Sequence, residues 1–181
     1  MTSTVTVFAP TNPTHVALLP SFADIHIACI ETDDMIATFT PPLKRDVIID
    51  WWKERAADAA EGKRIIIMAL AEDSAGREQL AGYVMLYRPL NEVEPTRAGV
   101  EKLLVSPNFR RRGLARMLME KLEEEAKSHG QTLLMLDTET GSPAEMIYPK
   151  LGYIQLGIVP KFGLSPVDGS LIAATFFWKQ L

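Results

Sequence analysis

The sequence predicts a single α/β domain with a mixed, mostly antiparallel central sheet flanked by helices. Short runs rich in β-branched and aromatic residues alternate with longer amphipathic runs along the whole chain. The length, 181 residues, suits one domain with a complete hydrophobic core. No internal repeat, low-complexity tract or linker interrupts the pattern, so we expect residues 1–181 to form one domain.

The N-terminal third is expected to be mainly helical after one short strand at residues 5–9. Residues 15–36 have a helical pattern, and residues 44–61 predict an amphipathic helix. Trp51 and Trp52 cannot both face the core from one helix, so one of them should lie at its margin. That residue is a candidate for a homodimer contact or for the wall of a substrate pocket.

The remainder of the chain alternates strands with two helices. Residues 64–71 and 79–87 are rich in Ile, Val, Leu and Tyr, and the turn-forming linker between them suits an antiparallel hairpin. A strongly periodic helix is expected at residues 114–127 and a short one at 143–151. The other strands are expected at residues 98–105, 133–137, 153–159 and 173–179.

The composition excludes several classes of protein. A net charge of −4 argues against binding to nucleic-acid phosphates. The single Cys29 cannot form an internal disulfide, and the three histidines lack metal-ligand spacing, so no metal site is expected. We found neither a long apolar run nor a secretory signal pattern, so we expect no membrane span and a cytoplasmic location.

The segment 105–116 (Val-Ser-Pro-Asn-Phe-Arg-Arg-Arg-Gly-Leu-Ala-Arg) joins a strand to a helix. The first amides of that helix have no intrahelical acceptors, and anionic oxygens bind well at such a terminus. Gly113 permits close approach of a ligand to the backbone, and Ala115 keeps the side chain at the second position small. The segment therefore predicts a diphosphate cradle rather than a solvated turn, with added charge from Arg110, Arg111, Arg112 and Arg116.

The spacing Arg110-x-x-Gly113-x-Ala115 resembles the Arg/Gln-x-x-Gly-x-Gly/Ala motif of the GNAT family of N-acetyltransferases. This resemblance implies a GNAT-like fold over nearly the whole chain and acetyl-CoA as cosubstrate, with no metal. It also implies that the backbone of the preceding strand (Leu103, Leu104, Val105) pairs with the pantetheine arm. The pyrophosphate would bind the amides of the following segment (Arg111, Arg112, Gly113, Leu114, Ala115, Arg116).

Residues 136–153 resemble the family's fifth strand and the Asn-x-x-Ala-x-x-x-Tyr-x-x-x-Gly-Phe/Tyr helix after it. The resemblance implies that Tyr148 is the general acid that protonates the departing CoA thiolate; the alternative is a packed aromatic residue. The chain departs from the pattern in two ways. Gly141 replaces the asparagine, and Pro149 must disturb the end of the helix.

An amine acceptor is protonated in water and must lose a proton before it attacks a thioester. Asp137 is the first candidate for the base or for an ammonium-binding group, and Glu101 is the alternative. Glu139 lies on the same strand face as Asp137 by the two-residue period. Asp33 and Asp34 could attract a cationic amine or serve at a helix end.

The stretches 137–144, 157–160 and 166–169 narrow the resemblance to the tabtoxin-resistance acetyltransferase subgroup, which acetylates a small amino-acid-like toxin. The expected function is transfer of acetyl from acetyl-CoA to a primary amine of a small molecule by direct attack. Two alternatives stay open. One is a CoA-binding regulatory module without catalysis, and the other is a protein or peptide N-acetyltransferase.

Overall fold

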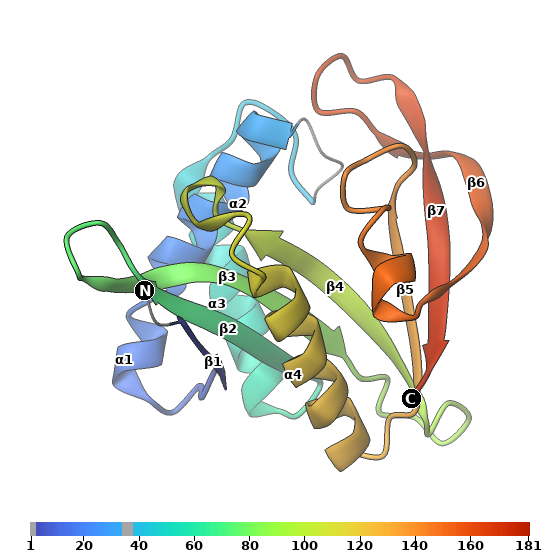
Figure 1. Cartoon of the computed structure of the whole chain (residues 1–181), viewed down its shortest axis with the longest axis horizontal. Helices are drawn as coiled ribbons and strands as arrows, with labels where there is room; N and C mark the ends of the chain where they lie inside the picture. Colours follow the sequence, from blue (N-terminus) through green and yellow to red (C-terminus); the bar gives the residue numbers. More distant parts are fainter. Residues whose placement is uncertain (1–2, 34–37) are drawn as a thin grey trace.

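The computed structural model describes residues 3–33 and 38–181. Within them, one seven-stranded sheet has the order β1-β2-β3-β4-β5-β7-β6 (Figure 1). All neighbouring strands are antiparallel except β4 and β5, which confirms the mixed, mostly antiparallel sheet. The strands are β1 (Ser3–Val7), β2 (Arg64–Glu72), β3 (Glu78–Tyr87), β4 (Arg97–Val105), β5 (Leu133–Glu139), β6 (Ile154–Leu164) and β7 (Leu171–Gln180).

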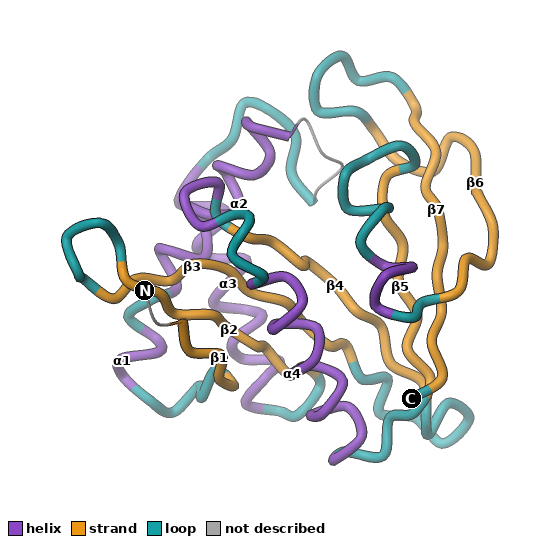
Figure 2. The backbone as a smooth tube through the Cα atoms, in the orientation of Figure 1, coloured by secondary structure: helices purple, strands orange, loops and turns teal. Residues whose placement is uncertain are grey.

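The helices cover both faces of this sheet (Figure 2). Among the described residues, none of them combines the length and the apolar character needed to cross a bilayer. They are α1 (Pro13–Val16), α2 (Leu19–Asp33), α3 (Arg45–Ala60), α4 (Leu114–Ser128) and two short 3-10 helices, η1 (Pro107–Phe109) and η2 (Tyr148–Leu151).

Two predicted helices differ from the structure. The helix expected at residues 15–36 is divided into α1 and α2, and its last three residues lie outside the described part. The helix expected at 143–151 is wrong, because residues 143–147 form successive turns and only η2 is helical. Gly141 begins this segment with φ +84°, and Pro149 has no N–H to donate, so a regular helix cannot run through it.

Each face of the sheet has its own hydrophobic core. The α4-side core contains the buried face of that helix, including Leu114, Leu118 and Leu122. The α2–α3-side core contains the aromatic residues Phe22 and Trp52. Trp51 lies at the margin of the α2–α3-side core with the Arg55 guanidinium 4.8 Å from its ring, as expected for one of two adjacent tryptophans.

The pairing between β4 and β5 is short. Only Arg97–Gly99 pairs with Leu133–Met135. Beyond these residues the two strands separate, and Figure 1 shows them diverging away from the C-terminus. A wedge-shaped opening therefore lies in the middle of the sheet, between strands that continue to Val105 and Glu139.

A β-bulge lies in β4 beside this opening. Lys102 and Leu103 together face one residue of β3, since the register passes from Met85↔Glu101 to Tyr83↔Leu104. Lys102 has φ +54°. The bulge reverses the alternation of side chains, so that the residues of β4 facing the α4-side core are Ala98 and Val100 before it and Leu103 and Val105 after it.

Candidate active site

A cleft of about 860 Å³ lies in the opening between β4 and β5. One wall is formed by the end of β4 and the start of α4, and the other by β5 and the turns that follow it. Lining residues from the first wall include Lys102, Leu103, Leu104, Val105, Arg110, Arg111, Gly113, Leu114, Ala115 and Arg116. The second wall includes Asp137, Thr138, Glu139, Ser142, Ala144, Ile147 and Tyr148.

The start of α4 is shaped to bind an anion. Gly113 is the residue before the helix, with φ +78°, and no side chain caps the first amides. The first intrahelical bond runs from the Met117 amide to the Gly113 carbonyl at 3.1 Å, so the three preceding N–H groups have no intrahelical acceptor. A Cβ at Gly113 would meet nothing within 4 Å, which leaves room for a ligand against the backbone. This geometry fits a pyrophosphate group.

The edge of β4 offers backbone groups to the cleft. The Ser106 amide donates to Ala81 of β3 at 2.9 Å. By the alternation of a strand, the backbone of Leu103 and Val105 therefore faces away from β3, toward the opening. The Val105 carbonyl already accepts from the Arg110 side chain (Nε, 3.3 Å) and from Cys29 (Sγ, 3.5 Å). This edge fits an extended, amide-containing arm such as pantetheine.

The four arginines of the motif have different surroundings. Arg110 forms two hydrogen bonds to Asp33 at the end of α2, of 2.7 and 2.6 Å, so it braces α2 against the loop before α4. Arg112 lies over the Phe109 ring at 5.0 Å and is not among the cleft-lining residues. Arg111 and Arg116 line the cleft.

Asp33, which the sequence offered as an attractor for a cationic amine, is engaged by Arg110. Asp34 lies outside the described residues.

Tyr148 is buried at the second wall of the cleft. Its ring packs against Tyr153 and Phe177, with centroids 5.8 and 5.6 Å away. Burial, with a smaller contribution from the charge of Asp137, raises the pKa of Tyr148 well above its ordinary value. The side chain is therefore a neutral phenol at physiological pH, the form that can donate a proton.

Asp137 lies near the end of β5 and opens into the same cleft. Desolvation by the cleft walls raises the pKa of its carboxyl; the charge of Lys102 acts in the opposite sense, and that of Glu101 adds to the increase. Glu139 lines the cleft two residues further on, as the strand period predicts. The wall that contains Tyr148 thus also contains two carboxylates.

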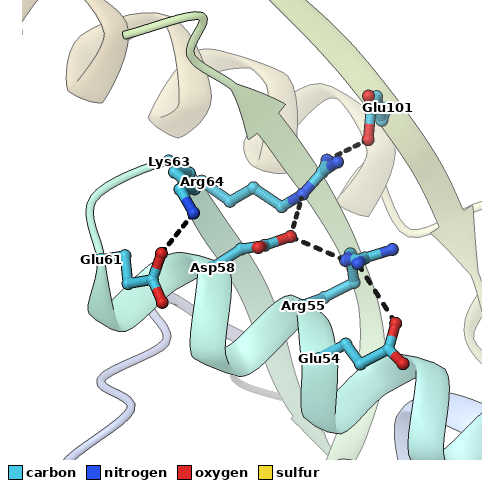
Figure 3. A network of polar contacts seen from close by, with 7 residues as sticks. All are labelled: Glu54, Arg55, Asp58, Glu61, Lys63, Arg64 and Glu101. Carbon is cyan, nitrogen blue, oxygen red and sulfur yellow. Dashed lines mark hydrogen bonds and ion pairs between the residues drawn. The ribbon is translucent and has the colours of Figure 1, made fainter.

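Glu101, the alternative base, does not line the cleft. Its carboxylate pairs with Arg64, which binds Asp58 of α3 at 3.0 Å (Figure 3). Asp58 in turn accepts from Arg55 at 2.9 Å. The geometry therefore favours Asp137 over Glu101, because Glu101 is held in an ion-pair network outside the cleft.

Sequence reasoning gave no role at the site to several lining residues, among them Cys29, Thr38, Lys102 and Phe162. The bulge that places Lys102 has no proline or glycine to mark it. Phe162 follows Pro160 within β6, where the register shifts, so a proline inside a strand pattern was a usable signal.

The histidines do not contribute to the cleft. His26 is buried against Trp51, Trp52 and Phe39, and neither of its ring nitrogens has a hydrogen-bond partner among the described residues. In the part of the chain that the structure describes, no cluster of three or more His, Cys, Asp or Glu could hold a metal ion.

Comparisons with known proteins show the family to which the chain belongs. Residues 26–153 match the acetyltransferase (GNAT) family. The chain is 29% identical over 103 residues to a [ribosomal protein bS18]-alanine N-acetyltransferase of Salmonella typhimurium. That match covers 56% of this chain and 64% of the relative.

Two solved structures share the fold. One is a GNAT superfamily phosphinothricin acetyltransferase from Sinorhizobium meliloti in complex with AcCoA, with TM-score 0.76, 17% identity, and coverage of 100% of this chain and 89% of that one. The other is a ribosomal-protein-alanine N-acetyltransferase from Brucella melitensis, with TM-score 0.72, 20% identity, and coverage of 98% and 99%. The chain therefore belongs to the acetyltransferase (GNAT) family.

Proposed function

We propose that this enzyme transfers the acetyl group of acetyl-CoA to a primary amine of a small molecule by direct attack, with Asp137 as base and Tyr148 as acid. The observation that carries the proposal is the second wall of the cleft, where both side chains line one opening opposite the β4 edge and the start of α4. The first wall would hold the cosubstrate through backbone groups of Leu103 and Val105 and the first amides of α4.

The proposed chemistry balances as follows. The acceptor ammonium gives one proton to Asp137, which passes it to solvent, and the free amine attacks the thioester carbonyl carbon. A C–N bond forms, the C–S bond breaks, and the nitrogen loses its second proton to solvent. The departing sulfur takes the proton of Tyr148, and Tyr148 regains one from solvent. One proton is released in each turnover.

The class of acceptor is supported by similarity alone. The fold neighbour from Sinorhizobium meliloti is a phosphinothricin acetyltransferase, in line with a small amino-acid-like toxin and a role in detoxification. The Salmonella typhimurium relative instead acts on an alanine of ribosomal protein bS18, so a peptide that begins with alanine belongs among the test substrates. A cytoplasmic location and a homodimer stay predictions.

The first experiment is calorimetric titration of acetyl-CoA, followed by thiol release with small amines and with a peptide that begins with alanine. We expect binding and amine-dependent release. Release with the peptide alone would contradict a small-molecule acceptor.

The base is tested through pH dependence. Since only the ionised carboxylate can accept a proton, kcat/KM of the wild type should rise with pH through the raised pKa of Asp137. Asp137→Asn should remove this acidic limb and lower kcat about 100-fold or more. Glu101→Gln is the control and should retain the limb. The same profile in Asp137→Asn as in the wild type would remove Asp137 from the role of base.

A further inference from the structure

Backbone strain in this protein is concentrated at the cleft. Among the described residues, three that are not glycine have positive φ: Lys102 (54°), Arg111 (60°) and Lys161 (54°). The first two line the cleft, and the third immediately precedes Phe162, which also lines it. A left-handed backbone is strained for a residue with a Cβ, and such strain persists mainly where function requires a particular placement. Of the two that line the cleft, Lys102 is the one to which no role has been given.

Lys102 has no close counter-ion in the part of the chain that the structure describes. Among the described residues, no carboxylate comes within 4.0 Å of its ammonium and none accepts a hydrogen bond from it. Glu101 acts on it through space but is paired with Arg64, and Asp137 acts on it from beyond ion-pair distance. Desolvation lowers the pKa of Lys102 by more than the charges of Glu101 and Asp137 raise it, so these carboxylates compensate its charge only in part. A cation partly removed from water is stabilised strongly by an anion that approaches it.

The bulge directs Lys102 to the side of the sheet opposite α4. Leu103 and Val105 pack on the α4-side core, next to the cradle at Gly113. His26 is buried on α2 in the other layer, and its pKa is lowered mainly by this burial and to a smaller extent by the charge of Lys102, which therefore lies near that layer. Lys102 therefore lies at the part of the cleft away from the pyrophosphate cradle, where an acceptor would approach the thioester.

We propose that Lys102 binds an anionic group of the acceptor, a carboxylate or a similar oxyanion, while Asp137 holds the ammonium group. This rests on the proposed function and deepens it. The two opposite charges, one contributed by each wall of the cleft, match a zwitterionic small molecule rather than a simple amine or the interior of a peptide chain. Lys102 is thus a specificity-determining residue for the acceptor.

The test uses amines in matched pairs that differ in one charge: the common α-amino acids and their carboxamides, each with saturating acetyl-CoA. For the wild type we expect kcat/KM to favour the carboxylate member of at least one pair. In Lys102→Met this preference should fall about 10- to 100-fold, the range expected for a charge-assisted hydrogen bond. The fall should result from a higher KM for the carboxylate member of the pair, and the kinetic constants for the carboxamide should be almost unchanged. Lys102→Arg should restore part of the preference.

Lys161→Met is the matched control, since Lys161 has the same φ and does not line the cleft. Acetyl-CoA affinity, measured for every variant, verifies that each one folds and binds the cosubstrate.

Several results would overturn the proposal. One is equal loss of kcat for both members of a pair, which would assign Lys102 to the reacting carbonyl. Another is a wild type that acetylates carboxamides as well as it does carboxylates. The last is an enzyme that binds acetyl-CoA but acetylates neither member of any pair. Turnover of carboxamides alone would reject the role of Lys102 while leaving the small-molecule acetyltransferase intact. Absence of amine-dependent thiol release with every amine would reject both.

Discussion

Arg110 holds Asp33 through two parallel hydrogen bonds, Nη1 to Oδ1 at 2.7 Å and Nη2 to Oδ2 at 2.6 Å. The first arginine of the phosphate-binding motif is therefore committed to the end of α2, and its Nε donates to the carbonyl that ends β4. These contacts connect the loop before α4 with the layer that covers the opposite face of the sheet.

Asp33→Asn should remove the ionic part of this brace. We expect the free energy of unfolding to fall by about 1 kcal/mol, because the pair is only partly exposed, and acetyl-CoA affinity to change by less than about threefold. Urea denaturation and calorimetry measure the two quantities. The control is Asp24→Asn, which breaks a similar two-bond pair with Arg45 on the open surface and should cost less. A tenfold loss of acetyl-CoA affinity in Asp33→Asn would place that carboxylate in the binding site instead.

Gly113→Ala should weaken acetyl-CoA binding by about tenfold or more, because the added methyl group lies where the pyrophosphate approaches the amides. The substitution also forces alanine into a left-handed conformation, at about 1–2 kcal/mol of stability. Gly130→Ala separates the two effects, since Gly130 has φ +76° and equally open surroundings but lies after the other end of α4. Both variants should lose similar stability, and only Gly113→Ala should lose affinity. Equal affinities would show that the cosubstrate does not approach this terminus.

Tyr148→Phe should lower kcat about 100-fold or more while leaving acetyl-CoA affinity close to that of the wild type. The expectation follows from a hydroxyl that has no hydrogen-bond partner among the described residues and belongs to a side chain lining the cleft. Tyr153→Phe is the matched control, because Tyr153 packs against the same ring but does not line the cleft. Single-turnover kinetics separate chemistry from product release. Unchanged chemistry in Tyr148→Phe would reject the acid role.

His26 should make stability depend on pH. Burial, with a smaller effect of the Lys102 charge, lowers the pKa of His26 to about 3, against 6.5 for the free side chain. Below pH 6.5 the unfolded chain binds a proton that the folded protein excludes, so stability falls as pH falls. Between pH 6.5 and 4.5 the wild type should lose about 2 kcal/mol more than His26→Leu, measured by denaturant unfolding. Parallel curves for the two proteins would mean that His26 is protonated in the folded state.

The sequence predicted elements whose signals are local and missed features that depend on tertiary pairing. The period of α4 and the high content of Ile, Val, Leu and Tyr in β2 and β3 were sufficient to locate these elements. The motif around Gly113 located the start of α4, because a strand, a proline and a helix start are encoded in consecutive residues. The prediction of a helix around Tyr148 was wrong because it followed the family pattern, although Pro149 and Gly141 disfavour a regular helix there.

The placement of Lys102 could not be predicted, since the bulge arises from pairing with β3 and has no local residue signature. The role of Arg110 was hidden for a similar reason. Its partner, Asp33, is separated from it by 77 positions in the sequence.

Because β4 and β5 pair over only three residue pairs, the sheet is divided into two halves that are joined by this short ladder. Tyr148 and Asp137 belong to the half that contains β5–β7, whereas Lys102 and the β4 edge belong to the other half. From Gly99 to Val105, β4 extends about 20 Å, so a rotation of about 3° at the short ladder moves the far end of β4 by roughly 1 Å. A displacement of that size can change a rate about 100-fold. Lys179 of β7 donates a hydrogen bond of 2.7 Å to Glu123 of α4, and this contact joins the two halves outside the cleft. We therefore expect side chains that never touch a substrate to affect how Tyr148 and Asp137 are aligned with the β4 edge.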